Sequence, residues 1–215
     1  MNPERTLYMN LTIIASFIIF ASIVSIFIKR SNRNTEKEQL SFWEKEQQAN
    51  DVRRRPLDDL DYVSIPLDTL PVTVMAEDSS VRDCLDTLSV LSEEKIVNFA
   101  GITNTDLKLT YGTANISVLS QYDQNFTLLV QTLQKWAETL HCAGYTAEAC
   151  QILEYAVSIH SDAGTSYRLL ASIYDREGKQ EKVAALYDAA LALTSPSGKT
   201  IARTLKEAYP YIGSI

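Results

Sequence analysis

Glycine, proline, cysteine and histidine are all scarce in this chain of 215 residues, and each scarcity excludes something. Seven glycines and six prolines are too few for a low-complexity protein. Cys84, Cys142 and Cys150 show no paired spacing, and an odd number of unpaired cysteines suits a reducing compartment. Together with His141 and His160 they do not form the close ligand pairs that zinc sites use. We therefore expect no metal and no cofactor.

Common enzyme motifs are also missing. The chain has no G-x-x-x-x-G-K-[ST] loop, no G-x-G-x-x-G motif and no G-x-S-x-G motif. The carboxylate pairs Asp58-Asp59 and Glu93-Glu94 fall where solvated or helix-capping roles account for them. We expect a protein that is not an enzyme, and no small-molecule substrate is evident.

Charge is unevenly distributed along the chain, whose net charge is −7. Residues 29–55 carry eight Lys/Arg against five Asp/Glu, whereas residues 56–215 carry eleven against twenty-one. A net charge of −10 over residues 56–215 argues against nucleic acid, whose binding proteins need a basic face. The basic segment before it can lie close to an anionic lipid surface.

One long apolar run extends from Leu11 to Ile28 and reads LTIIASFIIFASIVSIFI. Its eighteen uncharged residues span roughly 27 Å as a helix, enough to cross a membrane. A cleaved signal peptide carries its basic residues before the apolar run, but here Lys29, Arg30 and Arg33 follow it. By the positive-inside rule we expect an uncleaved single-pass helix over 11–28, an extracytoplasmic tail over 1–10 and a cytoplasmic C-terminal domain.

Residues 29–55 predict a charged juxtamembrane helix, because they lack glycine and proline. Phe42 and Trp43 allow three interpretations. The helix lies flat on the membrane surface, or these rings contact a partner helix, or the segment is a solvated spacer.

Residues 56–79 predict an extended strap. Pro56 ends the preceding helix, because proline disfavours helical geometry in the residue before it. The segment PLDDLDYVSIPLDTLP contains two further prolines with apolar residues between them. We favour a strap docked on the helical domain through Tyr62, Ile65, Leu67 and Leu70; a free strap would be a partner-binding motif.

Residues 80–125 predict the first helices of the domain. Ser80 with Asp83 resembles a capping box, and apolar residues follow at helical spacing. Ser92-Glu93-Glu94 predicts the start of a second helix that Gly101 ends. Asn104 or Thr105 predicts the cap of a third, ended by Gly112, and a fourth is expected over about 113–122.

The C-terminal half contains an internal repeat. LQKWAETLHCAGYTAEACQILEYAVSI, residues 133–159, aligns without a gap with YRLLASIYDREGKQEKVAALYDAALAL, residues 167–193, at an offset of 34. Small residues recur at two aligned positions, Ala137 with Ala171 and Ala156 with Ala190, and the turn glycines Gly144 and Gly178 also align. Large residues align in four further pairs: Leu133 with Tyr167, Trp136 with Leu170, Leu140 with Tyr174, and Leu153 with Tyr187. Ala149 aligns with Val183. This period is that of the tetratricopeptide repeat.

The predicted fold class is therefore all-α, with an N-terminal transmembrane helix followed by a tetratricopeptide-like (TPR-like) α-helical solenoid. The repeats are assigned to 130–163 and 164–197, and TIARTLKEAY predicts a capping helix within 198–215. In such repeats the first helix of each pair lines a peptide groove. The candidate groove residues are Gln131, Gln134, Lys135, Glu138 and His141 from the first repeat, with Thr165, Arg168, Leu169, Ser172, Asp175 and Arg176 from the second. Lys135, Arg168 and Arg176 would suit an acidic peptide or a C-terminal carboxylate.

The strings FWEKEQQANDVRRRPLDDLDYVSIPLDTLP and GITNTDLKLTYGTANISVLSQYDQNF, together with the two repeats, carry a resemblance. The chain resembles a group of uncharacterised single-pass membrane proteins of Gram-positive bacteria. The resemblance covers most of the chain and implies a bacterial plasma membrane and the architecture above, but no activity. The wider tetratricopeptide family implies a protein-binding module.

These observations predict a membrane-anchored scaffold or adaptor that binds a protein partner on the cytoplasmic side. The alternative is a structural subunit of a larger membrane complex, assembled through the transmembrane and juxtamembrane helices.

Overall fold

The computed structural model describes residues 39–212, which belong to two compact units, one reaching to Asp51 and one beginning at Val52. The first unit contributes a described helix over residues 39–50. The predicted span 11–28, the tail 1–10 and the basic flank lie outside the described residues. No helix within 39–212 is both long and apolar enough to cross a membrane.

The predicted helix over 29–55 is wrong at its C-terminal boundary, because helical structure ends at residue 50. The backbone of the following arginines pairs elsewhere. The Arg55 amide donates to the Tyr111 carbonyl at 3.0 Å, and the Asn115 amide group donates to the Arg55 carbonyl at 2.7 Å. The Arg54 guanidinium completes this contact by donating to the Asn115 Oδ1 atom at 2.9 Å. These tertiary hydrogen bonds replace helical ones.

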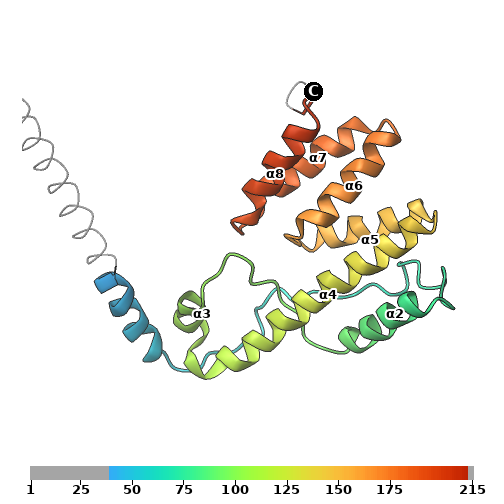
Figure 1. The fold of residues 1–215 in the computed structure, drawn as a ribbon. Helices are drawn as coiled ribbons and strands as arrows, with labels where there is room; N and C mark the ends of the chain where they lie inside the picture. Colours follow the sequence, from blue (N-terminus) through green and yellow to red (C-terminus); the bar gives the residue numbers. More distant parts are fainter. Residues whose placement is uncertain (1–38, 213–215) are drawn as a thin grey trace, which may run out of the picture. The chain divides into compact units, whose positions relative to one another are not determined.

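Residues 52–212 form an all-α unit, which confirms the predicted fold class at this level (Figure 1). Its elements are α2 (Ser79–Ser92), α3 (Asn104–Tyr111), the 3-10 turn η1 (Thr113–Asn115), α4 (Ile116–Cys142), α5 (Thr146–Ser158), α6 (Gly164–Arg176), α7 (Gln180–Leu191) and α8 (Ser197–Ala208). Within these residues an isolated antiparallel bridge between Tyr62 and Val97 is the one β-type pairing.

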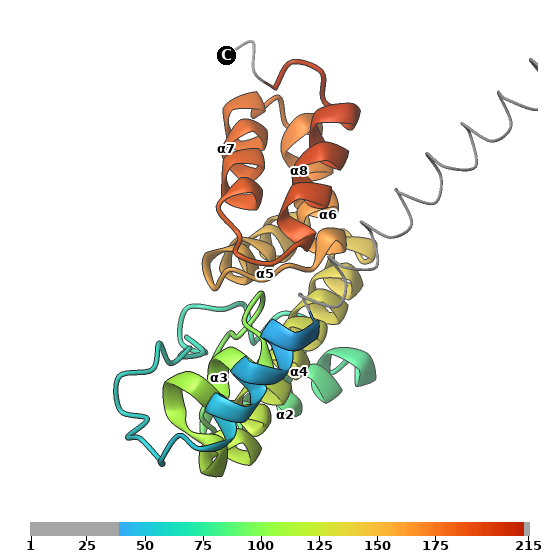
Figure 2. The ribbon, with the colours of Figure 1, turned by 90° about the vertical axis from the view of Figure 1, so that its left-hand side faces the viewer.

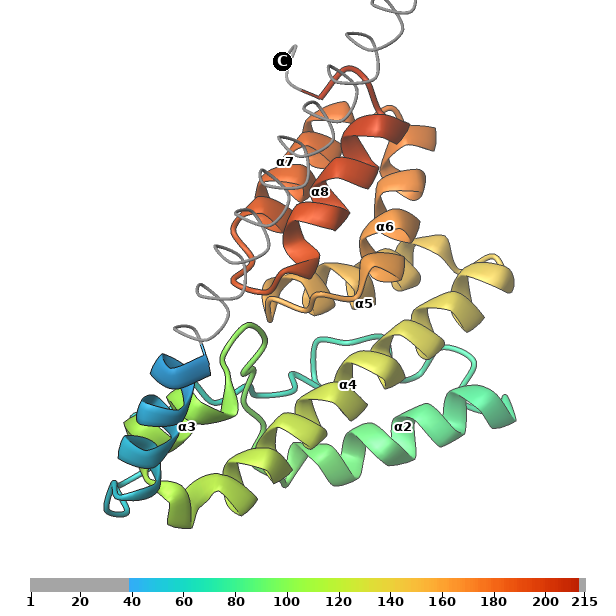
Figure 3. The ribbon, with the colours of Figure 1, turned by 60° about the vertical axis from the view of Figure 1, so that its left-hand side comes forward.

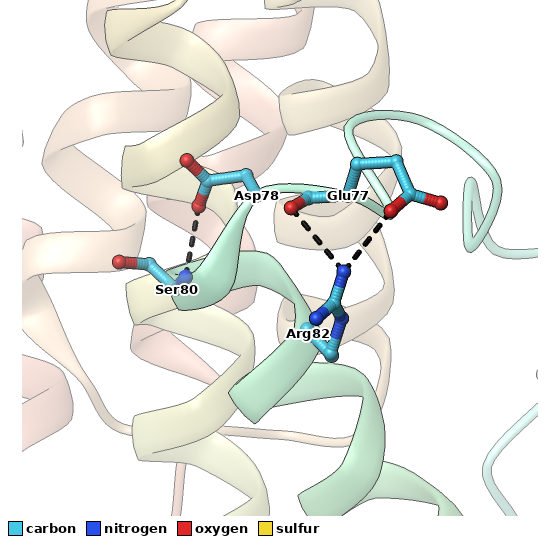
Figure 4. Close-up of polar contacts among 4 residues, drawn as sticks. All are labelled: Glu77, Asp78, Ser80 and Arg82. Atoms are coloured by element: carbon cyan, nitrogen blue, oxygen red, sulfur yellow. Dashed lines mark hydrogen bonds and ion pairs between the residues drawn. The ribbon is translucent and has the colours of Figure 1, made fainter.

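Helix α2 begins at a different cap from the one predicted. The Asp78 carboxylate accepts from the backbone amides of Ser80 at 2.9 Å and Val81 at 3.1 Å, and Glu77 pairs with Arg82 at 3.1 Å (Figure 4). Asp78 therefore replaces the predicted Ser80 cap, because its carboxylate satisfies two of the free amides at the helix start.

The predicted helix from Ser92 to Gly101 does not form. Residues 93–103 are irregular, and Ile96, Val97 and Phe99 are buried. The Ile96 carbonyl accepts from the Val63 amide at 2.9 Å, so this segment pairs with the strap instead of with itself. Helix α3 then starts after Thr103 and ends at Gly112, as predicted for its C-terminus.

Helix α4 is one continuous helix of 27 residues, which contradicts the predicted separate helix over 113–122 and the predicted division between 125 and 130. Neither glycine nor proline occurs between residues 113 and 143, so nothing in the sequence interrupts it. At 1.5 Å per residue it extends roughly 40 Å. Helix α4 thus joins the end of the predicted N-terminal segment, 80–125, to the first helix of the first predicted repeat, which begins at residue 130.

The strap packs on the helical unit. Ile65 and Leu70 are buried, and Tyr62 and Leu67 are half-buried. The Tyr155 hydroxyl donates to the Ser64 carbonyl at 3.0 Å. The strap is not extended throughout, since turns interrupt it near residues 58–59, 67–69 and 72–77. Its docking onto α5 agrees with the interpretation favoured from the sequence.

From α4 onward each helix packs against the next one in the chain. Helix α4 lies between α2 and α5 in Figures 1 and 3, and α6, α7 and α8 lie beyond α5, where α8 packs against both α6 and α7 (Figure 2). One apolar core runs through this stack and includes the fully buried Trp136, Leu133, Ile152, Tyr167 and Leu170. The stacking order places α4 and α6 as the first helices of two successive pairs.

The two pairs turn in the same way. After α4, the amides of Ala143, Gly144 and Tyr145 donate to the carbonyls of Thr139, His141 and Leu140. After α6, the amides of Glu177, Gly178 and Lys179 donate to the carbonyls of Ile173, Asp175 and Tyr174. Each donor and each acceptor lies 34 residues after its counterpart in the first turn. Gly144 and Gly178 have φ of +93° and +70°, a conformation that favours glycine at a helix end.

Candidate functional site

The eleven candidate groove residues lie on two helices, five on α4 and six on α6, and we call them the α4–α6 surface. Every one of them is exposed or half-buried, and none is part of the core. Gln134 links the two helices, because its Oε1 atom accepts from the Thr165 hydroxyl at 2.6 Å. Its amide group donates to the Glu138 carboxylate at 2.9 Å. The structure therefore brings Gln134, Glu138 and Thr165 together.

Other members of the α4–α6 surface make contacts within their own helix pair. The Ser172 hydroxyl donates to the Leu169 carbonyl at 2.8 Å. The His141 Nδ1 atom lies 3.3 Å from the Thr146 hydroxyl at the start of α5. These contacts hold the side chains at the surface without joining α4 to α6.

Residues that follow α8 cover part of this surface. The Tyr211 hydroxyl donates to the Asp175 carboxylate at 2.7 Å, and Ile212 is buried in the core. Asp175 at the C-terminal end of α6 is thus already engaged. A peptide would reach the α4 side of the surface more freely than this end.

The three cationic residues differ in their surroundings. Lys135 lines a pocket of about 220 Å³ between α2 and α4, together with Asp83 and Thr87. Arg168 and Arg176 are not among the residues that line it. An acidic-peptide clamp formed by these three cations stays a prediction.

One further pocket adjoins the α4–α6 surface, and another lies where α5 and α7 end. The first, which we call the α4 pocket, has a volume of about 360 Å³ and is lined by residues that include Asp123, Phe126, Gln131, Gln134 and Asp162. It contains two residues of the predicted groove. Carboxylates rather than cations supply its charge.

The second, which we call the α5/α7 pocket, has a volume of about 560 Å³. It lies where α5 and α7 end, and its lining includes Asp61, Ser64, Asn98, Ile102, His160 and Ser195. Asn98 and Ala100 line both this pocket and the α4 pocket, so the loop that holds them separates the two. The sequence did not single out Asp61, Asn98 or Ser195.

A polar cluster joins α5, α6 and α7. The Tyr174 hydroxyl donates to the Glu154 carboxylate, which also accepts from the Lys182 ammonium at 3.0 Å. Burial, the hydrogen bond and the Glu154 charge raise the pKa of Tyr174 above its ordinary value. Burial opposes ionisation of Glu154, but the Tyr174 hydroxyl and Lys182 outweigh it and lower the pKa of Glu154. Glu154, Tyr174 and Lys182 each have a partner within this cluster, so we assign it to packing.

The cysteines differ from one another in exposure. Cys84 is buried and Cys150 is half-buried, whereas Cys142 is exposed. Cys142 lies at the last turn of α4. Among residues 39–212, no group of three or more His, Cys, Asp or Glu side chains is placed to hold a metal ion.

Comparisons with protein-family models, with curated proteins and with solved structures found no match to this chain.

Proposed function

We propose that this protein is a membrane-anchored scaffold that binds a protein partner through TPR-like repeats, α4 with α5 and α6 with α7. One observation supports it above others: the turn of the first pair recurs 34 residues later with the same hydrogen bonds. A 34-residue helix pair is the unit of the tetratricopeptide repeat, whose stacks bind peptides. The anchor is the apolar run 11–28, which has the length of a membrane span.

The α4–α6 surface is the proposed contact. Its polar side chains stand on rigid helices, and Arg168 is exposed beside the half-buried Leu169. Rigid elements hold a binding surface in place at low entropic cost. Because the Tyr211 hydroxyl already donates to Asp175, we place the contact over Gln131, Gln134 and Lys135 on α4 and Arg168 on α6.

Site-specific crosslinking tests this contact. A photoreactive amino acid at Arg168 in the full chain, in its native membrane, should give a discrete adduct that mass spectrometry identifies. The matched control is the same amino acid at Asp188, which is exposed on α7 in the other helix of the pair. The double variant Lys135→Glu/Arg168→Glu should lose the partner in a pull-down. Equal adducts from both positions, or a pull-down unchanged by the double variant, would refute the assignment.

The anchor and its direction are tested separately. The full chain should stay in the membrane fraction after alkaline carbonate, and a chain without residues 11–28 should be released. A membrane-impermeant maleimide should label the exposed Cys142 only after the cells are permeabilised. Labelling of intact cells would place the helical unit outside.

A structural subunit of a membrane complex is the second candidate. On the helix over 39–50, Leu40, Phe42 and Trp43 are 64%, 53% and 62% exposed. Three large exposed apolar side chains within four residues suggest a contact with another apolar surface. Replacing residues 11–28 by an unrelated membrane span discriminates, since a scaffold keeps its partner and a packed subunit loses it.

A further inference from the structure

The α5/α7 pocket is built for a ligand that carries positive charge. It opens beside residues 158–160, at the end of α5, and residues 192–195, which follow α7. The C-terminal end of a helix carries partial negative charge, because its last carbonyls lack helical donors. Two such ends face one pocket here. Asp61 on the strap adds a carboxylate to the same lining.

Basic side chains do not neutralise this lining. Of the described residues that form it, none is Lys or Arg. Lys95 stands outside the lining, with its ammonium 5.1 Å from the centroid of the Tyr62 ring. Lys95 thus contacts the Tyr62 ring and is not part of the lining. Asp61 is the carboxylate that the lining contains.

The pocket is held in shape by its own hydrogen bonds. The Asn98 amide group donates to the carbonyls of Ile159 at 3.3 Å and His160 at 3.0 Å, and the Thr194 hydroxyl donates to the Ala100 carbonyl at 2.9 Å. These bonds tie the loop, the end of α5 and the segment after α7 into one frame. A frame of this kind binds a ligand without first being ordered.

We infer that the α5/α7 pocket receives a Lys or Arg side chain from a peptide segment of the partner protein. The head group would pair with Asp61 in the negative field of the two helix ends, and Ile102 and Leu193 would contact the aliphatic stem. The volume of about 560 Å³ lies within the range of ligand pockets. The net charge of −10 over residues 56–215 attracts a basic segment over a longer range.

This inference rests on the proposed function, because it names the chemistry of the partner. It assigns a basic segment to the α5/α7 pocket, whereas the sequence alone suggested an acidic one for Lys135, Arg168 and Arg176. The two sites are distinct, since none of those three residues lines the α5/α7 pocket.

Fluorescence anisotropy with a pair of capped peptides tests it. The full chain in nanodiscs of neutral lipid is titrated into labelled leucine–arginine–serine–arginine–leucine, and into the same peptide with citrulline in place of arginine. Citrulline keeps the shape of arginine and removes its charge. The arginine peptide should bind at least about tenfold more tightly, the difference expected for one charged hydrogen-bonded pair.

Two charge-reversal variants separate the pocket from the general charge of the domain. Asp61→Lys should weaken binding of the arginine peptide about tenfold or more. Asp58→Lys, which changes the charge equally on an exposed strap residue outside the lining, should change it less than about threefold. Circular dichroism should show both variants folded.

Three results would overturn the inference: no binding of either peptide, equal binding of the two peptides, or equal weakening by Asp61→Lys and Asp58→Lys. If the arginine peptide binds as expected but the photoreactive amino acid at Arg168 gives no adduct, the result would count against the α4–α6 surface alone. The two failures are therefore distinguishable.

Discussion

Trp136 shows what the predicted repeat requires of a single residue. It is fully buried, as is Leu170 at the matched position of the second pair. Its indole Nε1 atom has no hydrogen-bond partner within the described residues, so its role rests on packing rather than on a hydrogen bond. The alignment of the two stretches predicted both residues as core, because large side chains recur at that position.

We expect Trp136→Ala to lower the free energy of unfolding by roughly 3–5 kcal/mol, the cost of a large cavity in a core. Trp136→Phe should cost less, because it leaves a smaller cavity and removes no hydrogen bond. Urea unfolding followed by circular dichroism measures both. Leu128→Ala serves as the control, because Leu128 is 44% exposed on the same helix. Similar losses at Trp136 and Leu128 would contradict the assigned packing.

The thiols should react in an order set by their burial. Burial raises the pKa of Cys84 above its ordinary value, and burial with the nearby Glu177 and Glu154 carboxylates raises the pKa of Cys150 to about 11. Because the thiolate is the reactive form, we expect Ellman's reagent at pH 7.5 to modify one thiol rapidly, that of Cys142. Cys142→Ser should abolish this rapid phase, and rapid reaction of two thiols in the native protein would contradict the structure.

At the scale of elements, helices were predictable where glycine or proline marks their ends and apolar residues recur at helical spacing. Helices α5, α6 and α7 were expected from the 34-residue offset in the sequence and from the turn glycines Gly144 and Gly178. Residues 93–101 were not predictable, because Ile96 and Val97 pair with a strap that lies more than thirty residues earlier. Local sequence does not encode such a partner, and the tertiary pairing overrides the local helix signal.

Alanine should be tolerated better at Gly178 than at Gly101. Gly101 and Gly178 both have positive φ, +85° and +70°. A Cβ at Gly101 would lie 2.6 Å from the Thr194 carbonyl oxygen, whereas a Cβ at Gly178 would meet open space. Alanine at Gly178 should therefore cost about 1–2 kcal/mol of unfolding free energy, the strain of the backbone alone. Alanine at Gly101 should cost more, because the segment after α7 must also move.

Thermal unfolding of Gly101→Ala and Gly178→Ala measures this difference directly. The Gly101 contact also frames the α5/α7 pocket, since Thr194 lines it. A lower midpoint for Gly178→Ala than for Gly101→Ala would show that the close approach of residues 101 and 194 is wrong.

At the scale of the whole molecule, the two proposed sites differ in how far the sequence foretold them. The α4–α6 surface follows from the 34-residue period, because positions on a helix face repeat with the helix pair. The α5/α7 pocket does not, because Asp61, Asn98, His160 and Ser195 are scattered over the chain and no local pattern joins them. The strap and the irregular segment 93–103 create this pocket by docking where the helices end.

The stack of α5, α6 and α7 should also give the protein a pH-dependent stability. Glu154 on α5 accepts from Tyr174 on α6 and Lys182 on α7, and these contacts lower its pKa from 4.5. A carboxylate with a lowered pKa stabilises the folded state above the pKa of the unfolded chain, and this contribution is lost as the pH falls through the folded pKa. The free energy of unfolding should therefore decrease as the pH falls below about 4.5.

Glu154→Gln isolates this contribution. Urea unfolding at pH 7 should show the variant less stable by about 1 kcal/mol or less, because the side chains of Glu154 and Lys182 are 46% and 53% exposed and water screens their charges. The difference between the two proteins should shrink as the pH is lowered from 6 to 3, since the wild-type carboxylate becomes neutral like glutamine. Glu148→Gln is the matched control, because Glu148 lies on the same helix outside this cluster. A gap between wild type and Glu154→Gln that stays constant down to pH 3 would mean that Glu154 does not couple the three helices through its charge.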